Sequence, residues 1–158
     1  MKMRIALLFP SLKGGGVQRA MINLATGLKK QDGISVDFVV GKAAGPFSEL
    51  VPAGVRIIEL GGNGMLGRVP MLIRYLQKER PNCLMSAQYH VNLTAILARW
   101  LAGTKTPLVI SEHNDIQAVY KNAQSLKERL STRLTSVFYP FADRIVAVSQ
   151  GVAISLSK

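Results

Sequence analysis

Short apolar runs along the chain predict where its strands lie. Nearly unbroken runs rich in Val, Ile and Leu are typical of strands that are covered on both faces of a parallel sheet. The chain has six such runs, at residues 4–9, 34–40, 55–60, 83–85, 107–111 and 145–148. Their shortness and their flanking Gly and Pro residues favour strands over buried helices.

The segments between these runs repeat apolar residues every three or four positions, which is helical spacing. Val17, Met21, Leu24 and Leu28 form the first such stripe. The same reasoning predicts further helices at 47–51, 70–79, 93–102, 126–139 and from 149 onward, with a flexible glycine-rich connection at 61–67. Strands that alternate with helices predict an α/β fold, a doubly wound parallel sheet with helices on both faces.

Size and composition limit the class of protein. The 158 residues suffice for one domain, 1–158, with a sizeable core. No run approaches the roughly 20 apolar residues of a membrane span. The N-terminus lacks a signal-peptide pattern, and the lone Cys83 cannot form an internal disulfide, so we expect a cytoplasmic protein.

The net charge of +11 changes this picture, because a field of that sign favours anionic partners. The basic residues lie along predicted helices rather than in one tail. Two sets stand out: Arg68, Arg74, Lys78 and Arg80, and then Lys127, Arg129 and Arg133. They indicate either a solvated face or a surface for anionic lipid, which would place the protein peripherally on a membrane.

A glycine run follows the first predicted strand and precedes the first predicted helix. Gly14, Gly15 and Gly16 can adopt positive φ and let a ligand approach the backbone without a Cβ in the way. The N–H groups that begin the helix, together with its dipole, favour a bound anion there. The pattern predicts a phosphate-binding loop, although a tight turn alone would also use these glycines.

Ligands of open α/β sheets bind beyond the carboxyl ends of the strands. Both histidines of the sequence lie in loops that follow predicted strands, His90 after the fourth and His113 after the fifth. His113, between Glu112 and Asn114, could donate to a developing negative charge or to a sugar hydroxyl. Glu112 and Asp115 could act as bases or hydroxyl acceptors, or only cap a helix. No metal-ligand spacing and no G-x-S-x-G elbow occurs in the sequence.

Several of these stretches, in order, resemble the GT4 glycosyltransferases. The segment 12–25 is similar to that family's N-terminal signature, with Gln18 where the family commonly has Glu, followed by Arg19. The segments 78–84 and 142–152 resemble later family stretches, and 111–114 is similar to the strand-end histidine motif. The resemblance covers nearly the whole chain.

The resemblance implies the N-terminal half of a GT-B fold, a Rossmann-like domain that mainly binds the acceptor. It implies a second domain, absent from this chain, that holds the nucleotide-sugar donor. Transfer would retain the anomeric configuration and need no metal or other cofactor. By resemblance Gly15 and Gly16 would approach the donor phosphates or acceptor, and His113 would contact the transferred sugar. Further acceptor contacts would come from Arg19, His90, Glu112, Asn114 and Asp115. The acceptor would be a saccharide or a lipid-linked molecule.

Two other classes of function remain as alternatives. A dinucleotide-binding domain would explain G-x-G, but Arg19 replaces the third glycine, and Gly41 and Lys42 stand where an acidic ribose contact is expected. A nucleic-acid-binding module would explain the charge, but aromatic residues are few and no reading motif appears. We therefore expect no nucleic-acid partner.

Overall fold

The computed structural model describes residues 3–122 and 125–157, and of Met65, Lys127, Glu128, Ser131 and Thr132 the backbone only. Six strands form one parallel sheet in the order β3-β2-β1-β4-β5-β6. Their bounds are β1 Met3–Ser11, β2 Ile34–Lys42, β3 Arg56–Glu59, β4 Cys83–Ala87, β5 Leu108–Glu112 and β6 Arg144–Ala147. The predicted strands and the doubly wound α/β class are confirmed.

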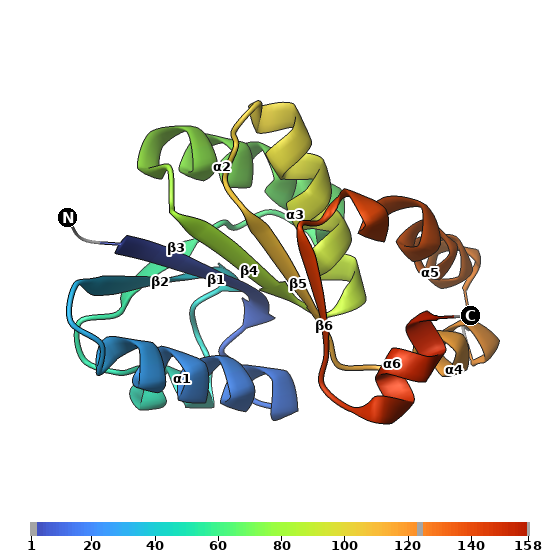
Figure 1. Cartoon of the computed structure of the whole chain (residues 1–158), viewed down its shortest axis with the longest axis horizontal. Coiled ribbons are helices and arrows are strands. Elements are labelled where there is room, and N and C mark those ends of the chain that lie inside the picture. The colour runs from blue at the N-terminus through green and yellow to red at the C-terminus, as the bar shows by residue number, and fades with distance from the viewer. Residues whose placement is uncertain (1–2, 123–124, 158) are drawn as a thin grey trace.

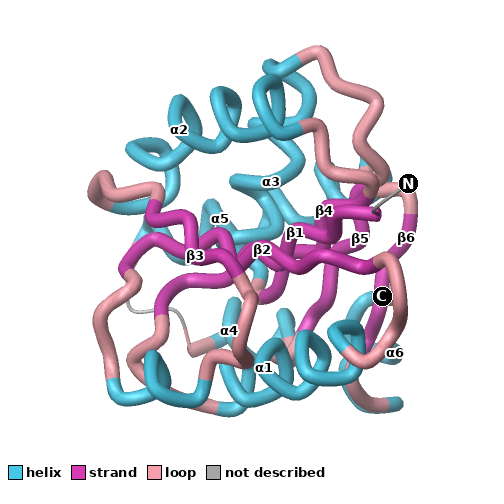
Figure 2. The backbone as a smooth tube through the Cα atoms, turned by 90° about the vertical axis from the view of Figure 1, so that its left-hand side faces the viewer, coloured by secondary structure: helices cyan, strands magenta, loops and turns pink. Residues whose placement is uncertain are grey.

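Helices cover both faces of the sheet (Figures 1 and 2). On one side lie α2 (Gly64–Glu79), α3 (Tyr89–Ala102) and α5 (Leu126–Phe138), and α1 (Gly16–Lys29) lies on the other. The shorter helices are α4 (Ile116–Lys121) and α6 (Gln150–Leu156), with 3₁₀ turns η1 (Pro46–Leu50) and η2 (Tyr139–Phe141).

Alternating strand residues fill two cores, one on each face. Leu8 of β1 and Leu84 of β4 pack with Leu72 and Leu76 of α2. Their neighbour Leu7 packs on the opposite face against α1. Each such fully buried side chain contributes about 1.5–3 kcal/mol through removal of apolar surface from water. The cores therefore hold the sheet rigidly enough to support loops at its edges.

Three helix predictions need correction. Helix α2 begins at Gly64, so Pro70 lies inside it and much of the connection predicted as flexible is helical. A Cβ on Gly62 would lie 2.5 Å from the Gly67 carbonyl oxygen, so the first turn packs against the chain that enters it. Helix α3 begins at Tyr89, one turn earlier than predicted, and α4 was not predicted. Close glycine packing accompanies the start of α2 and capping by Asp115 the start of α4, and neither produces apolar periodicity.

Candidate active site

The loops singled out in the sequence leave the same edge of the sheet. Every strand pairs in parallel with its neighbours, and β4 lies between β1 and β5. Adjacent strands are about 4.8 Å apart, so the glycine loop after β1 and the His113 loop after β5 start about 10 Å from each other. Strand order reverses between β1 and β4, which is the place where such sheets bind ligands.

The glycine loop presents backbone N–H groups at this edge. Gly14 and Gly15 have φ of +109° and +130°, a region that L side chains rarely adopt. Helix α1 follows at Gly16 with no side chain capping its N-terminus. A Cβ on Gly15 would lie 2.9 Å from Oε1 of Gln18, so a larger residue would also displace that side chain. The loop can thus direct amides and the helix dipole toward an anion.

Arg19 lies on the outer side of this loop. Its guanidinium is 4.9 Å from the ring centroid of Phe47 in η1, a cation–π contact. A Cβ on Gly14 would lie 3.5 Å from the same ring. Phe47 therefore links the exposed Arg19 to the glycine loop.

His113 directly follows β5 and is half-buried. Its Nε2 lies 3.0 Å from Oγ of the buried Ser111, and its backbone N–H donates to Glu112 Oε1 at 3.0 Å. Burial lowers the pKa of His113, because the protein interior disfavours the charged ring. The imidazole is therefore neutral at pH 7, and Ser111 fixes its orientation.

Glu112 does not offer a surface to an acceptor, which corrects the expectation of a direct contact. Its side chain is 0% exposed, and Oε1 accepts from the N–H groups of His113 (3.0 Å) and Asn114 (3.1 Å). Oε2 accepts from the hydroxyl of Tyr139 and from Nδ2 of Asn92 at 3.5 Å. Burial raises the pKa of Glu112 and these hydrogen bonds oppose that rise. Glu112 is thus the buried anchor of the His113 loop.

Asp115 is the N-cap of α4. Its Oδ1 accepts from the N–H groups of Gln117 (2.9 Å) and Ala118 (3.1 Å) and from the hydroxyl of Ser155 (2.6 Å). The hydrogen bond from Ser155, more than any other contact, lowers the pKa of this carboxyl. Of the roles expected for Asp115, the structure thus shows that of a helix cap. Asn114, between Glu112 and this cap in the sequence, is half-buried.

The loop after β4 carries backbone strain. Gln88 has φ +79° and ψ 139°, although it is not glycine. Strained residues of this kind concentrate at functional sites. His90 lies in the first turn of α3, edge-to-face with Tyr89 at 5.2 Å between ring centroids. Burial first, and then the charge of Arg68, lowers the pKa of His90, so this ring is also neutral.

The sequence prediction missed the residues that hold these loops in place. Ser86, Asn92 and Tyr139 form a buried network with Glu112, in which Ser86 donates to Asn92 Oδ1 at 2.7 Å and Asn92 Nδ2 lies 3.1 Å from the Tyr139 oxygen. An asparagine among the apolar residues of the 89–102 segment was the only local signal. The other contacts join residues far apart along the chain, so no motif displays them.

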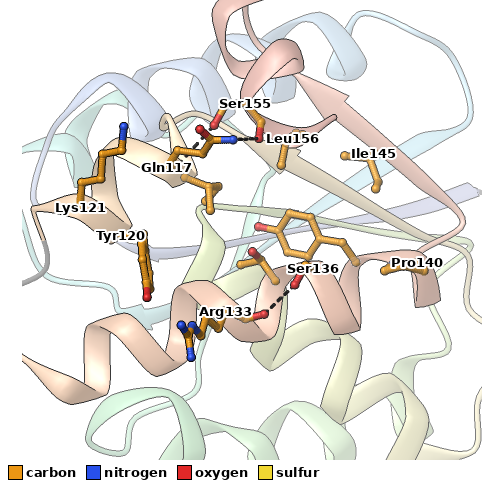
Figure 3. A pocket seen from close by; sticks show the side chains of 12 residues that line it. Gln117, Tyr120, Lys121, Arg133, Ser136, Pro140, Ile145, Ser155 and Leu156 are labelled. Carbon is orange, nitrogen blue, oxygen red and sulfur yellow. Dashed lines mark hydrogen bonds between the residues drawn. The ribbon is translucent and has the colours of Figure 1, made fainter. Parts of the chain in front are cut away.

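A cavity of about 560 Å³ opens beside the His113 loop (Figure 3). Ile116, the first residue of α4, lines the cavity, and Gln117 and Ser155 lie on one side of it. The basic Lys121 and Arg133 also line it, and the Arg133 guanidinium is 5.5 Å from the Tyr120 ring centroid. None of its lining residues belongs to the glycine loop.

Comparisons with known proteins define the class. Residues 14–158 match the sequence profile of Glycosyltransferase Family 4, and the chain belongs to that family. The parallel sheet matches GT-B glycosyltransferase structures. One is Anabaena Alr3699/HepE in complex with UDP-glucose, with a TM-score of 0.73 and 18% identity. Another is the lipopolysaccharide outer core galactosyltransferase WaaB in its apo form, with a TM-score of 0.68 and 16% identity.

Among curated proteins the chain is similar to an enzyme of Campylobacter jejuni subsp. jejuni serotype O:2. That enzyme is the GalNAc-alpha-(1->4)-GalNAc-alpha-(1->3)-diNAcBac-PP-undecaprenol alpha-1,4-N-acetyl-D-galactosaminyltransferase, 26% identical over 151 residues. The chain is covered to 90% by this match and spans 39% of the relative. It covers 40% of HepE and 42% of WaaB, with 98% of itself aligned in each. Family membership favours the glycosyltransferase interpretation over the dinucleotide-binding and nucleic-acid-binding ones.

Two further observations concern the described part of the chain. None of its helices combines the length and the apolar character that crossing a bilayer requires. Within the same residues no three His, Cys, Asp or Glu side chains come together in a way that could hold a metal ion.

Proposed function

We propose that this chain is the acceptor-side domain of a retaining glycosyltransferase that transfers a sugar from a nucleotide-sugar to a lipid-linked saccharide. The main support is that two groups lie at the same edge of the sheet. There the uncapped N-terminus of α1, preceded by Gly14 and Gly15, lies two strands from the neutral, oriented His113. Amides suit phosphates, and an imidazole suits a sugar hydroxyl.

Each group has a stated role in this proposal. The amides that follow Gly14, Gly15 and Gly16 hydrogen-bond a phosphate of the donor, or the acceptor, where no Cβ blocks the approach. His113 contacts the transferred sugar through the ring nitrogen that Ser111 leaves available. Glu112 positions His113 without touching substrate. No metal is part of the proposed reaction, and most of the nucleotide-sugar binds to a second domain.

The surface of α3 and α5 supports the lipid-linked class of acceptor. Trp100 is 76% exposed, and Leu126 and Leu130, one turn apart on α5, are 83% and 58% exposed. Arg129 and Arg133 lie on the same helix, also exposed. Apolar and basic side chains side by side suit the interface of an anionic membrane. The Campylobacter relative is named for an undecaprenol-linked acceptor. We place the protein peripherally at such a membrane.

The test uses the complete protein that the gene encodes. It is incubated with UDP-sugars and with diphosphate-linked and diphosphate-free lipid saccharides, and the anomeric configuration of the product is determined by NMR. Retained configuration, together with at least a hundredfold loss of kcat/KM in H113A, is the expected result. Inverted product, or transfer unaffected by H113A, would contradict the proposal. E49A, which changes an exposed carboxylate on η1, is the matched control.

A further inference from the structure

Arg68 of α2 is a cation whose side chain is partly buried and unpaired. Its Nε has no hydrogen-bond partner and no exposed surface. None of the ion pairs between described residues includes Arg68. A buried polar atom without a partner costs about 1–3 kcal/mol, more for a charged group. Such a group in a natural protein calls for an explanation, and a bound anion is one that suits a cation.

The backbone at the end of β2 is shaped around this guanidinium. A Cβ on Gly41 would lie 2.3 Å from Cζ, 2.5 Å from Nε and 2.6 Å from Nη2 of Arg68. The guanidinium therefore rests directly on Gly41, and any other residue there would displace it. Gly41 is buried and its φ is not positive, so close approach, not turn conformation, requires this glycine.

The nearest acidic side chain by strand register is already engaged. Glu59 on β3 pairs with Val40, the neighbour of Gly41. Its Oε2 accepts from the backbone N–H of Ala43 at 3.0 Å. Glu59 thus supports the loop after β2 instead of neutralising Arg68, which leaves the positive charge available.

Arg68 lies at the carboxyl edge, close to the point where strand order reverses. Gly41 is the penultimate residue of β2, next to β1. Burial is the main cause of the lowered pKa of His90 in the first turn of α3, and the charge of Arg68 adds to it. Helix α3 has 14 residues and no side chain caps its N-terminus. The guanidinium, the neutral His90 and the uncapped N-terminus of α3, which follows the strained Gln88, therefore all lie at the carboxyl edge of the sheet.

We propose that Arg68, with His90 and the first turn of α3, binds a phosphate or diphosphate group of the acceptor. A planar guanidinium matches phosphate oxygens with paired hydrogen bonds, and a neutral imidazole adds a further donor. The inference rests on the proposed function, since it names the anionic part of that acceptor. It assigns the donor phosphates to the glycine loop and the acceptor phosphates to Arg68.

The experiment compares R68Q and R68K with the parent in the complete protein. R68Q keeps most of the side-chain length and removes the charge. Losing one charge-assisted contact corresponds to about 1.5–3 kcal/mol, so the acceptor KM should rise about tenfold to a hundredfold while the donor KM stays within about twofold. R68K should recover part of this loss. R74Q, at an exposed arginine on the same helix, is the matched control.

Inorganic pyrophosphate supplies a direct readout that does not depend on transfer. Isothermal titration should show binding to the parent and to R74Q, and about tenfold weaker binding to R68Q. Equal pyrophosphate binding by R68Q, or a rise confined to the donor KM, would overturn the inference. Absent transfer with intact Arg68-dependent pyrophosphate binding would instead contradict the proposed function. Circular dichroism of each variant identifies misfolding, and G41A, which displaces the guanidinium, should reproduce the R68Q effect.

Discussion

Single side chains decide whether the His113 loop keeps its shape. Glu112 is buried and accepts hydrogen bonds from His113, Asn114, Tyr139 and Asn92. Such a carboxylate has more influence on the site than an exposed one, because its removal would take the side-chain acceptor from the N–H groups of His113 and Asn114. Glu112 would therefore affect activity through the shape of the His113 loop and not through a contact with substrate.

We expect E112A to lower both stability and activity. Each buried donor left without an acceptor costs about 1–3 kcal/mol, so the free energy of unfolding should fall by about 2–4 kcal/mol in urea titrations. Transfer should fall more than the folded fraction explains, since His113 loses its anchor. E49A, at an exposed carboxylate, should unfold like the parent. Unchanged unfolding of E112A would show that the network contributes no net stability.

Protonation of the two histidines should couple pH to stability. Burial lowers the pKa of both His90 and His113, so the folded state disfavours the charged rings. The unfolded chain then binds more protons below its histidine pKa of about 6.5, and stability is lost as the pH falls below that value. Comparing the parent with H90Q/H113Q between pH 5 and 8 isolates this contribution from that of Glu112. The variant should lose less stability than the parent as the pH falls from 8 to 5. Identical curves of unfolding free energy against pH for the two proteins would contradict this account.

At the scale of elements, a charged cluster connects β1, β2, β3 and α2 at the edge opposite the site. Asp37 of β2 is 3% exposed and accepts from Arg56 Nη2 at 2.6 Å and from the Tyr75 hydroxyl at 2.8 Å. Glu79 at the end of α2 pairs with Arg4 and Arg56. The cluster fixes how α2 lies on the sheet, and therefore where Arg68 at its other end is placed.

Replacing Asp37 with Asn should loosen this attachment. The substitution keeps the shape of the side chain but removes the charge that two hydrogen-bonded groups require, which costs about 2 kcal/mol. Urea unfolding of D37N measures this loss. Y75F removes one donor only and should cost about 1 kcal/mol. If D37N were as stable as the parent, the partly exposed Arg56 would be making no net contribution.

The α3–α5 surface gives a prediction about membranes. L130E places a negative charge among exposed apolar and basic residues, and W100A removes the most exposed aromatic side chain. Both should weaken sedimentation with vesicles of anionic phospholipid, L130E by about tenfold, since it loses apolar contact and adds repulsion. L50S, at an exposed leucine of η1, is the control. If the parent bound neutral vesicles as strongly as anionic ones, the predicted contribution of the basic side chains to membrane binding would be wrong.

At the scale of the whole molecule, the sequence allowed the architecture to be predicted better than the site. Strand runs and helical stripes are local patterns, so all six strands were found. The start of α2 was missed because close contact between Gly62 and Gly67 is a tertiary effect. The positions of the glycine loop and of His113 at the carboxyl edge of the sheet could be predicted because both directly follow strands; their roles remain predictions. The contact of Asn92 with Tyr139 and that of Arg68 with Gly41 were not predicted, because they join residues distant in the sequence.

The share of relatives that the chain covers leads to the last prediction. The chain spans about two fifths of each compared protein, and the edge that carries Gly15 and His113 is built by it alone. If most of the donor binds to another domain, the 158-residue chain should bind a diphosphate-linked acceptor yet give no sustained transfer from nucleotide-sugars. Product formation over many turnovers, followed by mass spectrometry, would contradict this division. A longer chain that carries a donor-binding domain together with these residues should give turnover, and the same chain with H113A should not, because the sugar would then lack its contact on the acceptor side.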